Sequence, residues 1–198
     1  MAEIVNEINI CTKCRLHQSR TNPVPGEGSL DSSLMFIGEA PGAREDATGR
    51  PFVGAAGKLL TQLIESIGLS RDEVYITNVV KCRPPQNRDP QADEIYTCLP
   101  YLRRQINIIR PRVIVTLGRH ATKTVFELAG IPFGSMTRVH GEEFRGRIDG
   151  KYVTIIPTYH PAAALYNPNL RKTLVEDFQI IKEALGKEYK GPLDHFIS

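Results

Sequence analysis

Short apolar segments alternate with longer amphipathic ones along most of the chain, and this alternation limits the possible folds more than any other feature. Residues 34–37 (LMFI), 74–80 (VYITNVV) and 113–117 (VIVTL) have the length and the apolar or β-branched content of buried strands. Between them, apolar residues recur at helical spacing within 55–67 and 92–109. Strands that alternate with helices predict a parallel sheet covered by helices on both faces.

The C-terminal part continues the pattern with a hairpin. Residues 137–156 alternate in polarity around an Asp-Gly pair, which is a strong hairpin turn signal, and we expect the second arm, VTIIP, to join the main sheet. Helices are expected over 120–129 and 171–185. We find no internal repeat and no long polar linker, so we expect one domain over residues 1–198.

The composition is typical of a soluble protein, with 41% hydrophobic and 24% charged residues. No apolar run approaches the roughly 20 residues that a membrane span needs. The first residues, MAEIVNEI, are acidic where a signal peptide has a basic flank and an apolar core. We therefore expect an intracellular, cytoplasmic protein that does not bind membranes.

The net charge of +3 is unevenly distributed. Residues 71–123 hold ten Lys and Arg residues and five Asp and Glu residues. A basic central segment fits a polyanionic partner, although a solvated charged face is the more common reason for such a bias.

The four cysteines form two pairs with the spacings C-x2-C and C-x15-C: Cys11 with Cys14, and Cys82 with Cys98. In a reducing compartment, paired thiols of this kind favour a metal site over disulfides. Zn²⁺ and a [4Fe–4S] cluster both accept four thiolates, and spacing alone does not separate them. Four protein ligands leave no open coordination position, so we expect the site to be structural.

Unusual loops follow three of the expected strands, at the edge where open α/β sheets bind their ligands. The first loop begins GEAPG at Gly38 and continues to RPFVG, and it has neither a GxGxxG nor a P-loop pattern. Its backbone N–H groups can hold a carbonyl or an anion, and an ordinary strand-to-helix turn is the alternative. Phe52 lies in its polar part as a candidate stacking platform, and an aromatic face on a base contributes roughly 1–3 kcal/mol.

Asn78 lies within a β-branched run, where an amide is normally avoided. A capping or turn role is one explanation. In a pocket, its amide instead offers one acceptor and two donors in a fixed plane. That pattern complements a pyrimidine edge with N3–H beside O4, whereas cytosine presents the wrong partner at both positions. A site of this kind discriminates against the wrong analogue by a factor of roughly 10⁴ or more in kcat/KM.

The third loop, YHPAAALYNP, starts at Tyr159, contains His160 and has a bulky tip, Leu165 and Tyr166. A surface turn with a satisfied histidine is the plain interpretation. The alternative is a catalytic hydrogen-bond donor joined to a wedge that fills the gap left by a base flipped out of its stack. We assign no role to the remaining histidines, which are His17, His120, His140 and His195.

Taken together, these segments resemble the family 4 uracil-DNA glycosylases, thermophile-type enzymes with an iron–sulfur cluster. The resemblance runs from Cys11 to about Pro168 through CTKC, GEAPGAREDATGRPFVGAAG, ITNVVKCRPPQNRDP and YHPAAALYNP. It implies a three-layer α/β/α fold around a four-stranded parallel sheet, with a [4Fe–4S] cluster on all four cysteines. It also implies release of uracil from single- or double-stranded DNA, which leaves an abasic site in base excision repair.

The resemblance implies a role for individual residues of the three loops. Asn78 reads the uracil edge, Phe52 stacks on the base, and His160 faces O2. Glu45 occupies the position near C5 that excludes the methyl group of thymine.

The first loop is expected to contribute backbone and a carboxylate. Glu39, Ala40 and Pro41 form the backbone that binds uracil. Family 1 enzymes have an aspartate that positions the attacking water where this chain has Ala40, so Glu39 is our candidate for handling that water. The expected catalytic residues are thus His160, Glu39 and Asn78.

DNA contacts are expected from Leu165 and Tyr166 as the wedge, and from Arg83, Arg88 and Lys81 on phosphates. We expect a monomer, and a sliding clamp is a candidate partner for which the sequence carries no signal.

The competing interpretation is a non-catalytic nucleic-acid-binding module stabilised by Zn²⁺, with Phe52 stacking on bases. It does not explain why Glu39, Asn78 and His160 all follow strand ends. Electron transfer fits less well, because the compact four-cysteine spacing of ferredoxins is missing.

Overall fold

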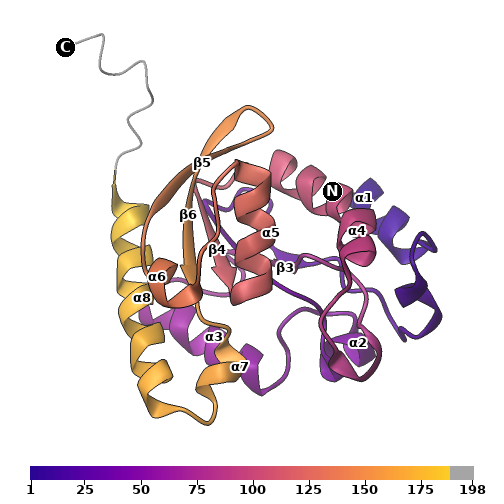
Figure 1. The fold of residues 1–198 in the computed structure, drawn as a ribbon, viewed down its shortest axis with the longest axis horizontal. Helices are drawn as coiled ribbons and strands as arrows, with labels where there is room; N and C mark the ends of the chain where they lie inside the picture. Colours follow the sequence, from indigo (N-terminus) through magenta and orange to yellow (C-terminus); the bar gives the residue numbers. More distant parts are fainter. Residues whose placement is uncertain (188–198) are drawn as a thin grey trace.

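A six-stranded sheet forms the centre of the molecule in the computed structural model, which describes residues 1–187 (Figure 1). Its strands run in the order β1-β3-β2-β4-β6-β5. Their bounds are β1 (Glu27–Gly28), β2 (Leu34–Gly38), β3 (Tyr75–Asn78), β4 (Val113–Leu117), β5 (Phe144–Ile148) and β6 (Lys151–Thr158).

The four inner strands are parallel, and the two edge strands are antiparallel to their neighbours. β3, β2, β4 and β6 pair side by side, with Gly38 opposite Asn78 in the β2–β3 register. β1 and β5 pair antiparallel with β3 and β6. The sheet thus has six strands and not the four expected, although its parallel part does consist of four strands. β1 is only two residues long and carries no apolar pattern, while β5 is the first arm of the expected hairpin.

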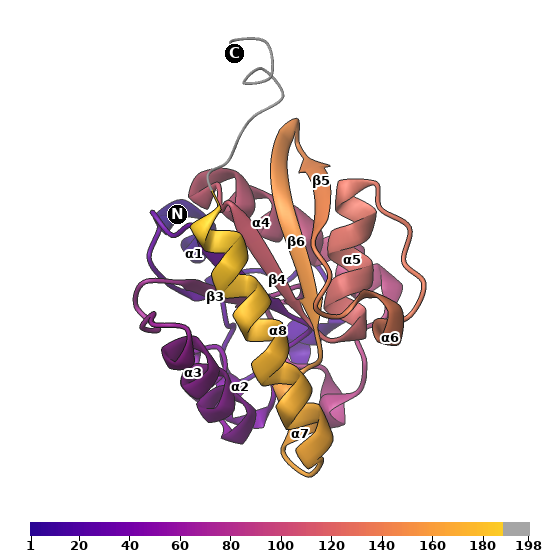
Figure 2. The same ribbon diagram turned by 90° about the vertical axis from the view of Figure 1, so that its left-hand side faces the viewer.

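Helices cover both faces of the sheet (Figures 1 and 2). Two 3₁₀ turns, η1 (Arg15–Gln18) and η2 (Pro85–Asn87), lie in the loops. The helices are α1 (Ala2–Asn9), α2 (Ala43–Thr48), α3 (Ala55–Ser66), α4 (Ala92–Ile109), α5 (Arg119–Ala129), α6 (Met136–Val139), α7 (Pro161–Ala164) and α8 (Pro168–Gly186).

Alternate residues of the four inner strands point to two separate apolar cores, because successive side chains of a strand face opposite sides of the sheet. Phe36 of β2 packs into the core that contains α3 and α8, and its ring stacks on Phe178 with centroids 5.7 Å apart. Its neighbour Ile37 faces the core formed with α1, α4 and α5. The helices and the sheet thus form three layers.

The long helices begin and end close to the predicted positions, while several short ones were not predicted. α4 starts at a capping box in which Gln91 and Glu94 satisfy each other's backbone N–H groups, and it ends before Pro111 as expected. α1, α2 and α7 are at most eight residues long, so their apolar periodicity is too brief to stand out. No helix among residues 1–187 is long and apolar enough to cross a bilayer.

The carboxyl ends of the parallel strands meet at one edge of the sheet. β2 ends at Gly38, β3 at Asn78, β4 at Leu117 and β6 at Thr158. The loops after these residues therefore converge, and side chains far apart in the sequence share one site.

Candidate active site

A cavity of about 340 Å³ opens at the carboxyl edge of the sheet. Its walls come from the loops that follow β2, β3 and β6 and from the start of α3. The lining residues are Ala40, Gly42, Glu45, Phe52, Ala56, Asn78, Asn87, His160 and Ala162. The structure thus brings together five of the predicted uracil-binding residues, and it adds Asn87.

Asn78 is the last residue of β3, and its side chain is 1% exposed. Among the residues that the structure describes, its Oδ1 is the one buried side-chain polar atom without a hydrogen-bond partner. Gly38 makes room for it, since a Cβ there would lie 2.4 Å from this Oδ1. Buried acceptors are normally paired, and an unpaired one costs about 1–3 kcal/mol. The amide therefore offers the cavity an acceptor that requires a donor.

Phe52 is fixed in an uncommon backbone conformation, with φ +51°. Arg71 Nη1 donates to its carbonyl oxygen at 3.1 Å. Gly57 passes so close that a Cβ there would lie 1.8 Å from the same oxygen. The Phe52 ring stacks against the imidazole of His160, with centroids 5.6 Å apart and planes tilted by 28°. Strain of this kind persists only where the surrounding structure holds it, as it does at this cavity wall.

His160 caps the first turn of α7 with its own side chain. The backbone N–H of Ala162 donates to His160 Nδ1 at 3.1 Å. Burial lowers the pKa of His160 to about 4, so the ring is neutral at neutral pH. Because Nδ1 accepts a hydrogen bond, the single ring proton lies on Nε2. His160 therefore presents one N–H donor.

Glu45 forms a rigid part of the cavity wall. Its Oε1 accepts hydrogen bonds from the backbone N–H groups of Val53 at 2.9 Å and Gly54 at 3.1 Å. These two bonds tie α2 to the turn that carries Phe52, so the carboxylate stays at one position.

Glu39 and Pro41 do not line the cavity. Glu39 directs its carboxylate toward Asp89 and His120, and the donor atoms of these three side chains lie within 4.8 Å of one another. His120 Nε2 lies 2.9 Å from Asp89 Oδ2. Burial, opposed by the charges of His120 and Arg119, raises the pKa of Glu39.

His120 was assigned no role in the sequence analysis, yet it lies beside a predicted catalytic carboxylate. A signal was available: His120 follows the end of β4, which is the neighbour of β2 in the sheet. Asn87 lacked such a signal, because its approach to the cavity depends on the course of the Pro-rich loop. His195 lies outside the described residues.

Comparison with known proteins gives one consistent family. A sequence model of the uracil DNA glycosylase superfamily matches residues 25–182. The type-4 uracil-DNA glycosylase of Sulfurisphaera tokodaii is 57% identical over all of this chain and 90% of its own length. Those of Archaeoglobus fulgidus and Thermotoga maritima are 51% and 48% identical over 98% and 95% of the chain, and over 97% and 96% of their own lengths.

The chain belongs to the type-4 uracil-DNA glycosylases. The resemblance inferred from its motifs is thereby confirmed.

The residues of this type-4 uracil-DNA glycosylase that were predicted to contact DNA differ in their solvent exposure and in whether their side chains already bind another residue. Leu165 is 38% exposed and Tyr166 is 92% exposed at the turn between α7 and α8, a few residues from His160. Arg83 donates through Nε to Asn87 Oδ1 at 2.7 Å and is partly exposed. Arg88 instead binds the buried carboxylate of Glu94 through both Nη atoms, at 2.8 and 2.6 Å.

Lys81 does not contact DNA phosphates, so that expectation was wrong. Its side chain is 1% exposed and its Nζ lies inside the protein. Burial lowers the pKa of Lys81 to about 7. Lysine in a polar loop is usually solvated, and the acceptors that hold this one come from β3 and α4.

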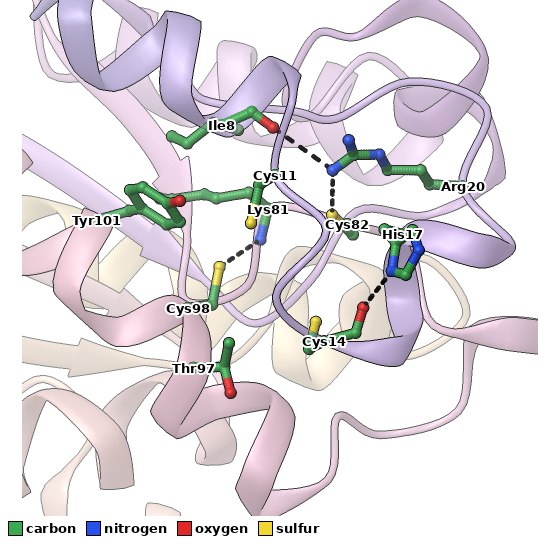
Figure 3. A pocket seen from close by; sticks show the side chains of 10 residues that line it. All are labelled: Ile8, Cys11, Cys14, His17, Arg20, Lys81, Cys82, Thr97, Cys98 and Tyr101. Carbon is green, nitrogen blue, oxygen red and sulfur yellow. Dashed lines mark hydrogen bonds between the residues drawn. The ribbon is translucent and has the colours of Figure 1, made fainter.

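Four cysteines surround a second, smaller cavity of about 10 Å³ in this type-4 uracil-DNA glycosylase (Figure 3). Cys11 and Cys14 lie between α1 and η1, Cys82 follows β3, and Cys98 lies on α4. All four are free thiols. The structure therefore brings the two sequence pairs to one place.

Hydrogen-bond donors lie against two of these buried sulfur atoms, as expected for thiolates that bind a metal centre. Arg20 Nη1 donates to Cys82 Sγ at 3.0 Å, and the backbone N–H of Lys81 donates to Cys98 Sγ at 3.3 Å. Burial raises the pKa of Cys14 and of Cys82, and raises that of Cys98 to about 12. Buried thiolates need a cationic partner to form, and a metal centre supplies one.

Proposed function

We propose that the protein hydrolyses the N-glycosidic bond of deoxyuridine in DNA, releasing uracil and leaving an abasic site. The observation that carries this proposal is the unpaired Oδ1 of Asn78, buried at the wall of the cavity. In the proposed complex, uracil N3–H donates to this oxygen and uracil O4 accepts from Nδ2. Cytosine has an acceptor at N3 and a donor at position 4, so it would leave both amide atoms unpaired.

His160 is proposed to stabilise the departing base. Its neutral ring presents Nε2–H, which we assign to uracil O2, where negative charge grows as the C–N bond breaks. A donor already fixed at that position needs no reorganisation during the reaction, and losing one such donor typically costs on the order of 10²–10³ in rate. The bond from Ala162 fixes both the tautomer and the ring orientation.

Phe52 and Glu45 are proposed to set the shape of the base site. Phe52 offers an aromatic face for stacking, and its ring is already held against His160. Glu45 is tied to two backbone N–H groups and cannot swing away easily. A carboxylate fixed near C5 excludes the methyl group of thymine, which accounts for rejection of the normal DNA base.

Glu39 remains our candidate for orienting the attacking water or stabilising the positive charge on the sugar. Its neighbour Ala40 lines the cavity, while its own carboxylate lies just outside, facing Asp89 and His120. The Glu39 carboxylate therefore lies beside the base site rather than within it. We propose that this position leaves room for the attacking water. The charge of His120 favours the ionised Glu39 carboxylate, whereas the neighbouring Asp89 carboxylate opposes it.

The DNA face is proposed to follow the rim of the cavity. Leu165 and Tyr166 project from the turn after His160 and are suited to fill the gap in the stack when uracil is flipped out. Arg83 is the better placed of the two arginines for a phosphate, because both Nη atoms of Arg88 are engaged by Glu94. Single-stranded DNA needs no wedge, so both forms of DNA are proposed as substrates.

A [4Fe–4S] cluster is proposed at Cys11, Cys14, Cys82 and Cys98. The four cysteines come from separate segments of the chain and line one cavity. Four thiolates suit either Zn²⁺ or a [4Fe–4S] cluster, and the motif resemblance to the type-4 enzymes supports the cluster. When bound, the cluster supplies a covalent link between the N-terminal segment, the loop after β3, and α4.

The non-catalytic module accounts for the cysteines but not for an unpaired amide acceptor beside a neutral histidine. Incubation of the purified protein with uracil-containing DNA separates the two functions. We expect free uracil and alkali-labile abasic sites from single and double strands. DNA binding without base release would favour the module.

A further inference from the structure

Lys81 is a buried amine that none of the roles proposed so far uses. It follows the end of β3 by three residues and immediately precedes Cys82. Its Nζ lies 2.6 Å from Thr77 Oγ1, 2.6 Å from the Asn78 carbonyl oxygen and 2.7 Å from Gln105 Oε1. Three acceptors match the three donors of one ammonium group, so every hydrogen of Nζ has a fixed partner.

The acceptors are themselves oriented by further hydrogen bonds. The hydroxyl of Thr77 donates to the Pro25 carbonyl oxygen at 2.8 Å. Gln105 Nε2 donates to the same carbonyl at 2.8 Å and to the Tyr75 hydroxyl at 3.2 Å. The network is therefore closed and buried, and such fully satisfied networks favour one arrangement of their members.

This network reaches the base-reading residue through its backbone. Lys81 Nζ binds the carbonyl oxygen of Asn78, while Asn78 Oδ1 has no partner within the protein. The carboxamide oxygen is thus not held by a bond of its own, and its position follows from the backbone that carries it. On the other side, the backbone N–H of Lys81 donates to Cys98 Sγ, as Figure 3 shows. One residue therefore spans the cysteine pocket and the end of β3.

We propose that Lys81 is a positioning residue for uracil recognition, which holds the Asn78 carbonyl so that the carboxamide meets the edge of the base. This inference rests on the proposed role of Asn78. Without the Nζ bond, the end of β3 loses its tie to α4 and the carboxamide samples other positions. A misplacement of about 1 Å at a reacting centre can cost on the order of 10²-fold in rate.

The test compares Lys81→Met with Gln105→Met. Lys81→Met removes the bond to Asn78, whereas Gln105→Met removes a bond of the same network and leaves that bond in place. For each variant, three quantities are measured: uracil release from DNA, inhibition by free uracil base, and affinity for abasic-site DNA. Metal content per chain and melting temperature are recorded for each preparation.

We expect Lys81→Met to lower kcat/KM for uracil on the order of 10²-fold and to weaken inhibition by free uracil. Affinity for abasic-site DNA and metal content should stay at the wild-type level. Gln105→Met should lower the melting temperature while keeping inhibition by uracil. Equal effects of the two variants on uracil inhibition, or loss of metal from Lys81→Met, would overturn the inference. If Lys81→Met does not fold, Lys81→Gln is measured with the same expectations.

Asn78→Ala separates failure of this inference from failure of the base-site proposal. If Asn78→Ala keeps normal inhibition by free uracil, the assignment of Asn78 to the base site is wrong. If Asn78→Ala loses inhibition and Lys81→Met keeps it, the base site stands and the role of Lys81 is refuted.

Discussion

The backbone N–H of Ala162 donates to Nδ1 of His160 at 3.1 Å, and this bond determines which ring nitrogen of His160 can act on a ligand. A nitrogen that accepts a hydrogen bond carries no proton, so in the neutral ring the proton lies on Nε2. Burial keeps the ring neutral by lowering its pKa to about 4. Sequence alone could not establish this protonation state, because both the capping bond and the burial arise from the fold.

Replacement of His160 tests the donor role. His160→Ala removes Nε2–H, and we expect the single-turnover rate of uracil release to fall on the order of 10²–10³-fold. Affinity for uracil-containing DNA should change much less, because the donor acts mainly as charge develops on the base. A variant that loses binding while its single-turnover rate survives would identify His160 as a binding residue.

The pH dependence of the reaction distinguishes Glu39 from His160. Burial raises the pKa of Glu39 above its ordinary 4.5 and lowers that of His160 to about 4, so falling pH protonates Glu39 first. If ionised Glu39 is required, the single-turnover rate of the wild type should decline on the acid side above pH 4.5.

In Glu39→Gln, the residual rate should stay flat to lower pH and decline only near the pKa of His160. Single-turnover rates between pH 4 and 8 provide the measurement. A decline centred near 6.5 in both proteins would mean that His160 has its ordinary pKa, in contradiction to the lowering of that pKa by burial.

The wedge assignment predicts different effects on the two forms of DNA. Tyr166→Ala and Leu165→Ala should slow uracil release from duplexes more than from single strands, since only a duplex leaves a gap to fill. Tyr152→Ala is the matched control, because Tyr152 is also exposed but lies at the other end of β6. Equal slowing on duplex and single-stranded DNA would argue against the wedge.

The cysteine site predicts a colour and a metal content. The wild type should be yellow-brown, with four iron atoms and four sulfides per chain. Cys98→Ser should lose the visible absorbance and melt at a lower temperature, whereas Thr97→Ala, at a neighbouring position of the same cavity, should keep both. A colourless wild type containing one zinc ion per chain would replace the cluster with a zinc site.

The sequence predicted the inner strands and long helices well, because their apolar periodicity reflects burial directly. Helix α4 matches its predicted bounds, and β2 differs by one residue. Edge strand β1 was missed, because two residues of a glycine-containing segment carry no periodic signal. Helix α2 was missed because six residues between glycines resemble a loop.

Asn78 and His160 could be placed near each other from the sequence, because the carboxyl ends of β3 and β6 lie at the same edge of the parallel sheet, and both residues line the cavity. Prediction failed for Lys81, whose burial depends on acceptors from β3 and α4 and not on its neighbours in the loop. It also missed His120, since the end of β4 was not considered together with the other strand ends. Such contacts depend on strand order, which the sequence pattern leaves open.

The selectivity of base release tests the central claim most directly, namely that the Asn78 amide reads the uracil edge. Wild type and Asn78→Asp are incubated with otherwise identical DNAs that contain uracil, cytosine or thymine at one position. We predict that the wild type releases uracil alone, and that Asn78→Asp loses most uracil release and gains measurable release of cytosine. Undiminished, uracil-selective release by Asn78→Asp would contradict the account.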